Sequence, residues 1–277
     1  MTIDQIIDQA LIEDIGDGDH TSDACIPAEA QGKAKLLVKE PGIIAGVELA
    51  KQIFLKFDSN LKVETFINDG ASISVGDIIL TVEGSSRSIL KTERLVLNFM
   101  QRMSGIATKT ANLNKLIEGT SAKLLDTRKT TPLLRQLEKL AVKIGGGVNH
   151  RFGLFDMVMI KDNHIDMAGG IEAAISRTKA HLASIGKDLK IEVEVRDFDE
   201  LNEVLSVGGI HRIMLDNFHP DDEKKAVDLI AGRFETEASG GITEETIRAH
   251  ALAGVDYISV GALTHNIKSL DLSLKAA

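Results

Sequence analysis

The sequence predicts an α/β protein whose C-terminal part is an open, incomplete α/β barrel. From residue 122 onward, six short apolar segments alternate with segments of helical spacing, which is the pattern of βα units around a parallel sheet. Glycine-rich turns follow several of these segments, and this suits a barrel better than an open sheet. Six strands are fewer than the eight of a complete barrel, which takes about 250 residues. A doubly wound sheet is the alternative.

Each expected element of this barrel is a short apolar run or an amphipathic stretch between two such runs. The expected strands are Ala122–Asp126, Asp156–Lys161, Lys190–Val195, Arg212–Asp216, Glu235–Ser239 and Tyr257–Gly261. The expected helices lie near 132–144, 170–185, 197–207, 220–232 and 243–253.

Residues 1–110 indicate mixed helices and strands without a regular alternation. Helical apolar spacing covers Ile3–Ile12 and Gly46–Phe57, whereas Lys33–Lys39 and parts of 69–80 are strand-like. The run from Asp14 to Asp23 is rich in glycine and aspartate and predicts a loop. The long apolar-periodic stretch Ser88–Ile117 predicts two helices with a break near Ser104-Gly105.

Composition and charge exclude several classes of protein. A hydrophobic fraction of 43% and a charged fraction of 26% are ordinary for a globular chain. The net charge of −9 argues against broad binding to nucleic acid or to an anionic membrane. Cys25 is the only cysteine, so no internal disulfide or multi-cysteine metal site is expected. The start of the chain has no signal-peptide pattern and no apolar run approaches about 20 residues, so we expect a cytoplasmic protein.

Positive charge is concentrated in one stretch of this acidic chain. Eight lysines and arginines and three acids lie between Lys123 and Lys161, a local excess of five positive charges. The spacing of Arg135, Lys139 and Lys143 predicts a solvated helix face. The remaining candidates lie at or after expected strand ends and predict a local anion site; they are Arg128, Lys129, His150, Arg151 and Lys161.

Polar residues end all six expected strands, where a βα barrel binds its ligands. Glu192 and Glu194 alternate with apolar residues, so both carboxylates are expected to point into the barrel. Asp216 ends the next strand. Gly240 and Gly241 follow the fifth strand directly before an expected helix, and this arrangement lets backbone N–H groups approach a phosphate. A tight turn that needs positive φ is the alternative interpretation of these glycines.

These strand ends predict a site with two zones. The later strands carry carboxylates and a phosphate-binding turn, which suits a sugar phosphate with Mg²⁺, a cation that bridges carboxylates to phosphates. The first two strands and the loop Gly145-Gly146-Gly147 are cationic. Because arginine pairs with planar carboxylates through two parallel hydrogen bonds, this zone suits a substrate with more than one carboxylate.

The same residues carry a family resemblance that covers nearly the whole chain. In order, the motifs are Asp-Thr-Arg-Lys-Thr-Thr-Pro at 126–132, Gly-Gly-Gly-Val-Asn-His-Arg at 145–151, Lys-Asp-Asn-His at 161–164, Glu-Val-Glu-Val at 192–195, Leu-Asp-Asn at 215–217, Ala-Ser-Gly-Gly-Ile at 238–242 and Gly-Ala-Leu-Thr-His at 261–265. Upstream, Glu93-Arg94 and Ser104–Thr108 continue the pattern. The chain resembles the quinolinate phosphoribosyltransferases.

The resemblance implies an N-terminal α/β sandwich domain at 1–110 and an open six-stranded barrel at 111–267, with the tail 268–277 packing on the sandwich and two copies forming a homodimer. It implies that phosphoribosyl pyrophosphate and quinolinate give nicotinate mononucleotide, pyrophosphate and CO₂ with Mg²⁺, in NAD biosynthesis. The implied ligands of the dicarboxylate are Arg128, Lys129, His150, Arg151, Lys161 and, from the partner subunit, Arg94. Lys129, Lys161, Glu194 and Asp216 are the implied catalytic residues, and Glu194 and Asp216 serve the ribose and the metal. Ser239, Gly240, Gly241 and Gly261, with His265 nearby, would hold the 5′-phosphate.

Two other functions fit part of this pattern. A related phosphoribosyltransferase-like protein acting on another aromatic acid would share the phosphate half of the site. A Schiff-base barrel aldolase would use Lys161 as its nucleophile, but such a lysine needs few anionic partners, and Asp162 follows Lys161 directly.

Overall fold

The computed structural model describes residues 1–277, and the chain divides into two compact units drawn from separate stretches of sequence. The first unit comprises Met1–Ala111, Thr130–Gly146 and Ala262–Ala277, and the second comprises Asn112–Lys129 and Gly147–Gly261. Helix α4 (Ser86–Leu116) begins in the first unit and ends in the second.

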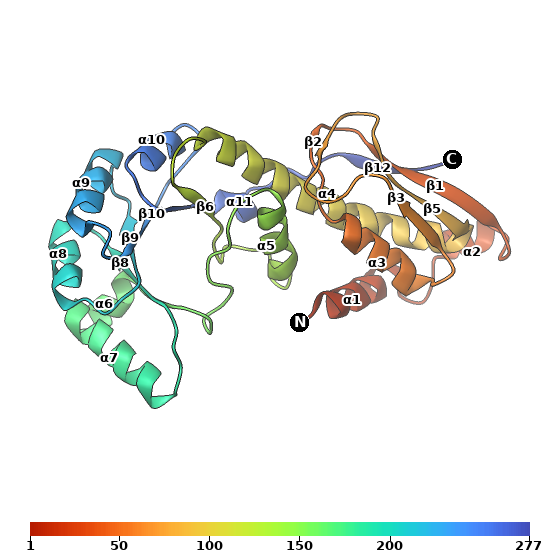
Figure 1. The fold of residues 1–277 in the computed structure, drawn as a ribbon. Coiled ribbons are helices and arrows are strands. Elements are labelled where there is room, and N and C mark those ends of the chain that lie inside the picture. Colours follow the sequence, from red (N-terminus) through yellow and green to blue (C-terminus); the bar gives the residue numbers. More distant parts are fainter. The chain divides into compact units, whose positions relative to one another are not determined.

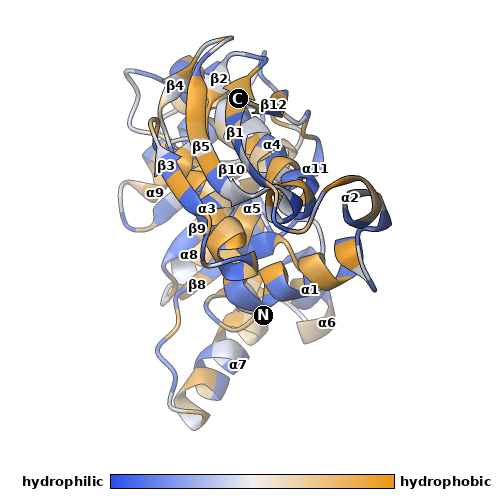
Figure 2. Ribbon diagram, turned by 90° about the vertical axis from the view of Figure 1, so that its right-hand side faces the viewer, coloured by the Kyte–Doolittle hydropathy of each residue, from blue (hydrophilic) through white to orange (hydrophobic).

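In the first unit, an antiparallel sheet pairs the C-terminal strand of the chain with strands from its first 85 residues (Figure 1). Its strand order is β12 (Leu272–Ala276), β1 (Gln31–Val38), β5 (Ile78–Ser85), β3 (Lys62–Thr65). Buried apolar residues such as Leu36 and Leu80, which are paired in the register of β1 and β5, line the core face, and β5 is largely hydrophobic in Figure 2. A separate pair, β2 (Gly42–Ile43) and β4 (Ser72–Ile73), is also antiparallel. The pairing of β12 with β1 fixes the C-terminal residues on this sheet.

Helices complete the first unit. They are α1 (Ile3–Ile15), α2 (His20–Cys25), α3 (Val47–Phe57), most of α4, α5 (Arg135–Ile144) and α11 (Ala262–His265). The loop predicted for Asp14–Asp23 is partly wrong, because α2 begins within it at His20. The side chain of Asp19 accepts a hydrogen bond from the N–H of Ser22 and caps this short helix.

Helix α4 is continuous over 31 residues, so the predicted break near Ser104-Gly105 is wrong. The small polar residues there serve close packing instead. The Ser104 hydroxyl accepts a hydrogen bond from the N–H of Ala45 at 2.9 Å and lies 3.2 Å from the Ala45 carbonyl oxygen. At Gly105, an added Cβ would lie 2.3 Å from the carbonyl oxygen of Lys268. The glycine therefore allows the C-terminal segment to approach the helix backbone.

This contact gives an expected result for Gly105→Ala. In an exposed helix the exchange would stabilise the protein by about 1 kcal/mol, but here the new methyl group collides with a backbone carbonyl. We expect the free energy of unfolding to fall by about 1–3 kcal/mol, as for other overpacked sites. Urea unfolding measures the change. Lys115→Ala, at an exposed position of the same helix, is the control and should shift stability by no more than about 0.5 kcal/mol; a stabilised Gly105→Ala protein would contradict the packing argument.

The solvated face predicted for α5 is wrong in part. Lys139 and Glu138 are buried, with exposed fractions of 3% and 1%. The carboxylate of Glu138 accepts hydrogen bonds from the guanidinium of Arg102 and from the N–H of Thr131. Residue spacing along α5 cannot show that Arg102, on α4, pairs with Glu138.

The second unit contains a six-stranded parallel sheet (Figure 1). Its strands are β6 (Lys123–Leu125), β7 (Val158–Ile160), β8 (Ile191–Val195), β9 (Arg212–Asp216), β10 (Glu235–Ser239) and β11 (Tyr257–Ser259), in the order β6-β11-β10-β9-β8-β7. Successive strands from β7 to β11 are neighbours, and β6 joins beyond β11. The order never reverses at a switch point, as it would in a doubly wound sheet. The strands are therefore wound as in a barrel that stays open between β6 and β7, which confirms the expected fold class.

Helices alternate with these strands, as expected. They are α6 (Asp162–Ala168), α7 (Ile171–Ser184), α8 (Phe198–Val207), α9 (Pro220–Ile230) and α10 (Ile247–Leu252). Sequence reasoning missed α6, which begins immediately after Lys161, and it began α10 too early, near 243. None of the helices combines the length and the apolar character needed to cross a membrane.

Candidate active site

Functional side chains of the second unit lie at the carboxyl ends of its parallel strands. Asp126 follows β6, Lys161 follows β7, Asp216 ends β9 and Ser239 ends β10. Asp216 and Ser239 are direct neighbours in the register of β9 and β10. Because all six strands run in parallel, these ends meet at one edge of the sheet. The structure therefore gathers at this edge most of the predicted site residues that belong to the second unit.

The centre of this edge is an ion pair between Lys161 and Glu194. The Nζ atom of Lys161 lies 2.6 Å from Oε2 of Glu194, whose side chain is almost fully buried. Asp216 lies on the next strand, and burial first, then the negative charge of Glu194, raises the pKa of its carboxyl group. The ammonium of Lys161 opposes that rise. The buried carboxylate of Glu194 and the partly buried carboxylate of Asp216 therefore lie near the ammonium of Lys161, which belongs to the predicted cationic zone.

The cationic zone contains Arg128 and Arg151. Arg128 and Lys129 are exposed, whereas Arg151 is partly buried. Burial first, and then the positive charge of Arg128, lowers the pKa of the Arg151 guanidinium. One face of this guanidinium is held by the protein, since Nη1 donates to the carbonyl oxygen of Met157 at 3.3 Å. Like charges repel each other, so an anion bound near both guanidinium groups would be stabilised.

Asp126 fixes the loop that carries Arg151. Its carboxylate is fully buried, and it accepts hydrogen bonds from the N–H of His150 at 2.8 Å and from the side-chain amide of Asn149 at 3.0 Å. The loop also continues the sheet, because Val148 donates its N–H to the carbonyl of Leu124 on β6. The backbone before Arg151 is therefore anchored to the end of β6.

The glycine turn after β10 packs against the turn after β9. Gly240 and Gly241 have φ angles of 101° and 59°, which glycine adopts without the strain that a side chain would add. An added Cβ on Gly240 would lie 2.2 Å from Oδ1 of Asn217, whereas Gly241 faces open space. The helix expected directly after this turn begins only at Ile247. The positive φ angles expected for a tight turn are therefore confirmed, whereas the phosphate contact stays a prediction, and it would involve the turn rather than a helix end.

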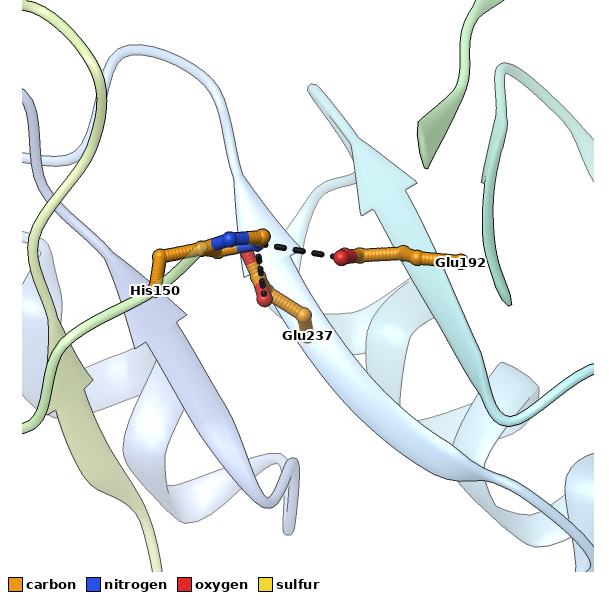
Figure 3. Close-up of side chains that lie close together, drawn as sticks. All are labelled: His150, Glu192 and Glu237. Atoms are coloured by element: carbon orange, nitrogen blue, oxygen red, sulfur yellow. Dashed lines mark ion pairs between the residues drawn. The ribbon is translucent and has the colours of Figure 1, made fainter. Parts of the chain in front are cut away.

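A buried charged network, missed by sequence reasoning, lies below the strand ends (Figure 3). The Nε2 atom of His150 lies 3.0 Å from Glu192 and 3.3 Å from Glu237, and all three side chains are buried. Arg212 on β9 donates to Glu237 at 2.8 Å and to Glu235 at 3.1 Å, and its guanidinium stacks 4.0 Å from the ring centre of Tyr257. The pairing of these residues depends on the sheet register, although a glutamate inside an otherwise buried strand is a signal that sequence analysis can use.

Two predicted residues belong to the first unit. Arg94 lies on α4 and His265 ends α11, and both side chains are exposed. Their roles at the strand ends of the second unit stay predictions.

Cations, paired carboxylates and a glycine turn at the strand ends of an open barrel define an enzyme that acts on small anionic substrates. Residues 19–104 match the N-terminal domain, and residues 106–275 the C-terminal domain, of quinolinate phosphoribosyl transferase. The chain belongs to the quinolinate phosphoribosyltransferase family.

Individual relatives align with this chain over almost its full length. The chain is 49% identical to quinolinate phosphoribosyltransferase [decarboxylating] 1b of Nicotiana tabacum, across 98% of this chain and 81% of that one. It is 41% identical to a probable nicotinate-nucleotide pyrophosphorylase [carboxylating] of Bacillus subtilis, across 99% and 93%. The crystal structure of NadC from Streptococcus pyogenes superposes with a TM-score of 0.93 at 40% identity, covering 99% and 96%.

Proposed function

We propose that this enzyme transfers the phosphoribosyl group of phosphoribosyl pyrophosphate to the ring nitrogen of quinolinate, with loss of CO₂. The products are nicotinate mononucleotide, pyrophosphate and CO₂, which places the reaction in NAD biosynthesis. The family membership and the names of the relatives support this reaction. The observation that carries it within this chain is the Lys161–Glu194 ion pair, which links a cationic pocket to the carboxylates of the ribosyl half.

The acid half of the site holds the pyridine dicarboxylate. Arg128 and Arg151 each offer a planar fork of donors to a carboxylate, and Lys129 and Lys161 add point charges. Binding of two carboxylates neutralises charges that otherwise repel one another. The ring is thereby oriented with its nitrogen toward the ribosyl donor.

The ribosyl half stabilises positive charge. The pyridine nitrogen attacks the anomeric carbon while the bond to pyrophosphate breaks, and the ribose ring carries positive charge in the transition state. Glu194 and Asp216 are the negative groups at the strand ends that stabilise this charge. No covalent intermediate with the enzyme is needed. The bond to the carboxylate beside the quaternised nitrogen then breaks and CO₂ leaves. The electron pair stays on the ring carbon, where the adjacent positive nitrogen stabilises it, until a proton from solvent takes the place of the carboxylate.

Glu194 and Asp216 also suit Mg²⁺. Both offer carboxylate oxygens, the ligands that this ion prefers. Burial and then the negative charge of Glu194 raise the pKa of Asp216, and a divalent cation would offset that negative charge. Mg²⁺ bound here would neutralise charge on the pyrophosphate leaving group. The 5′-phosphate fits the turn Ser239-Gly240-Gly241 together with Gly261, with His265 as a further candidate.

The Schiff-base alternative is disfavoured by the partner of Lys161. A Schiff-base lysine needs few anionic partners, whereas Nζ of Lys161 lies 2.6 Å from the buried carboxylate of Glu194.

Product stoichiometry tests the proposed reaction. The purified chain is incubated with quinolinate labelled at the carboxylate next to the nitrogen, phosphoribosyl pyrophosphate and Mg²⁺. We expect one CO₂ and one pyrophosphate for each nicotinate mononucleotide, and no reductive trapping of substrate by borohydride. Release of CO₂ without nucleotide, or a borohydride adduct on Lys161, would refute the proposal.

We further propose a homodimer in which Arg94 enters the acid pocket of the other subunit. The exposed position of Arg94 on α4 supports this role, and closed two-fold symmetry would build two identical composite sites. The competing interpretation is that Arg94 is a solvated surface arginine whose ion pairs contribute about 0–1 kcal/mol to the free energy of unfolding.

Subunit complementation tests the composite site. Arg94→Ala and Lys161→Ala proteins are each expected to be inactive. Mixing them gives heterodimers in which one of the two sites takes both residues from unmutated positions. We expect up to half of the sites in a heterodimer to recover activity. A mixture that exchanges subunits, as shown by mass spectrometry, but regains no activity would exclude the action of Arg94 across the interface.

We also propose that the enzyme works in the cytoplasm, which the single cysteine supports because it provides no disulfide. Several plant relatives are named as chloroplastic or mitochondrial proteins. Microscopy of a fluorescent fusion of the full chain in its native cell tests the location.

A further inference from the structure

The imidazole of His150 is enclosed by the protein on both nitrogens. On one side, Nε2 faces the carboxylates of Glu192 and Glu237, which come from β8 and β10 (Figure 3). On the other side, Nδ1 accepts a hydrogen bond from the backbone N–H of Arg151 at 2.6 Å. The side chain is only 5% exposed. A residue that binds a substrate carboxylate must offer it an N–H group, and both ring nitrogens are already engaged.

The two carboxylates are held by the sheet itself. Glu192 and Glu237 have no exposed surface, and Arg212 on the strand between them donates to Glu237 at 2.8 Å. Burial and the charge of Glu237 raise the pKa of Glu192 to about 7. The three side chains of His150, Glu192 and Glu237 also form a set with metal-ligand spacing. Arg212 supplies positive charge to Glu237, and the raised pKa of Glu192 favours the neutral form of that carboxyl group.

Charge and hydrogen-bond geometry favour different protonation states of this ring. Burial opposes protonation, but the hydrogen bonds and charges of Glu192 and Glu237 outweigh it and raise the pKa of His150 to about 9. A second proton, on Nδ1, would point at the N–H proton of Arg151 across a nitrogen–nitrogen distance of 2.6 Å. Such a contact is repulsive, so the position of Nδ1 disfavours a proton on that nitrogen. We therefore place the single proton on Nε2, which faces the two carboxylates at 3.0 and 3.3 Å.

We infer that His150 is a positioning residue that orients Arg151 toward the acid substrate and does not bind the substrate itself. The chain of contacts runs from Glu192 and Glu237 through the ring to the backbone N–H of Arg151. Asp126 holds the preceding peptide through the N–H of His150 at 2.8 Å. Arg151 is thereby fixed on a backbone anchored to β6, β8 and β10. This inference rests on the proposed function and changes the role that the family resemblance implies for His150.

Nitrogen NMR of the full chain with labelled histidine rings tests the inference directly. The His150 signals are assigned by their loss in His150→Gln. We expect a proton on Nε2 and none on Nδ1 in the free protein, and no change of this state with saturating quinolinate. A proton on Nδ1, either in the free protein or after quinolinate binds, would overturn the inference. If calorimetry shows no quinolinate binding, the proposed function fails instead, while the state of the free ring still decides the role of His150.

Quinolinate affinity of matched variants gives a second, independent readout. If the ring acts through its carboxylates, Glu192→Gln should weaken quinolinate binding by about 10–100-fold, the range for residues that orient a ligand. The double variant His150→Gln/Glu192→Gln should bind no more weakly than the weaker single variant.

The control is Glu223→Gln, which alters a second buried pair in the same unit. Glu223 on α9 lies 2.9 Å from His250 on α10, and both are buried. We expect Glu223→Gln to keep wild-type quinolinate affinity. Wild-type affinity in Glu192→Gln, or losses that multiply in the double variant, would contradict the positioning role.

Discussion

Replacing Lys161 with methionine is expected to reduce kcat/KM for quinolinate by about 10²–10³-fold, the usual effect of removing one charged group that stabilises a transition state. Methionine keeps much of the volume of the side chain but removes the ammonium that lies 2.6 Å from Glu194. The loss combines a missing contact to the acid substrate with an uncompensated buried carboxylate next to the ribosyl donor. Steady-state kinetics with both substrates varied measures it.

Lys225→Met is the matched control for this experiment. Lys225 also pairs with an acid, Asp222, at 2.7 Å, but both side chains are largely exposed on α9. Surface pairs of this kind contribute little, so activity should stay within about twofold of wild type. Far-ultraviolet circular dichroism verifies that the Lys161→Met protein is folded. A folded Lys161→Met protein with near-normal kcat/KM would remove Lys161 from the proposed site.

Neutralising Glu194 is expected to act on kcat rather than on acid binding. Glu194→Gln removes the charge that stabilises positive charge on the ribose, so we expect kcat to fall by about 10²–10³-fold. Asp216→Asn should act in the same direction. In the double variant the two reductions in kcat should not multiply, because the carboxylates of Glu194 and Asp216 act as one unit.

Calorimetry separates this role from substrate binding. Quinolinate should still bind Glu194→Gln, because its carboxylates are held by the cationic zone. Asp199→Asn, at an exposed position on α8, is the control and should behave as wild type. Loss of quinolinate affinity with unchanged turnover at saturation would reverse the assignment of Glu194.

The sequence was sufficient to predict the barrel strands because each is a short apolar run with polar residues at its end. The observed β9 and β10 have the predicted bounds, and β8 begins one residue later than expected. Hydrophobic alternation also placed Glu192 and Glu194 on one face of β8, and both are buried. The local sequence pattern gives a wrong prediction where a residue contacts another residue that is far away along the chain. Gly105 signals a break by itself, yet α4 continues through it, and the missing side chain makes room for the backbone of Lys268.

The site could be predicted only as a set of residues at strand ends, not as a set of pairs. Spacing gave Lys161 and Glu194 separate roles, whereas the parallel register of β7 and β8 joins them in one ion pair. The contacts of His150 with Glu192 and Glu237 depend on the loop after α5, which brings the ring to two other strands. Such contacts follow from the strand order of the sheet and are not visible in the spacing along the chain.

The central claim is that the acceptor is a dicarboxylate held by Arg128, Arg151 and Lys161, and the ratio of kcat/KM for quinolinate and nicotinate tests it most directly. Nicotinate has the same ring with one carboxylate fewer, so it would leave charged groups of the pocket unpaired. Sites that lose a partner of this kind discriminate by about 10⁴-fold or more. We expect a ratio of that size in favour of quinolinate. Comparable turnover of nicotinate, or of another aromatic monocarboxylate, would contradict the account.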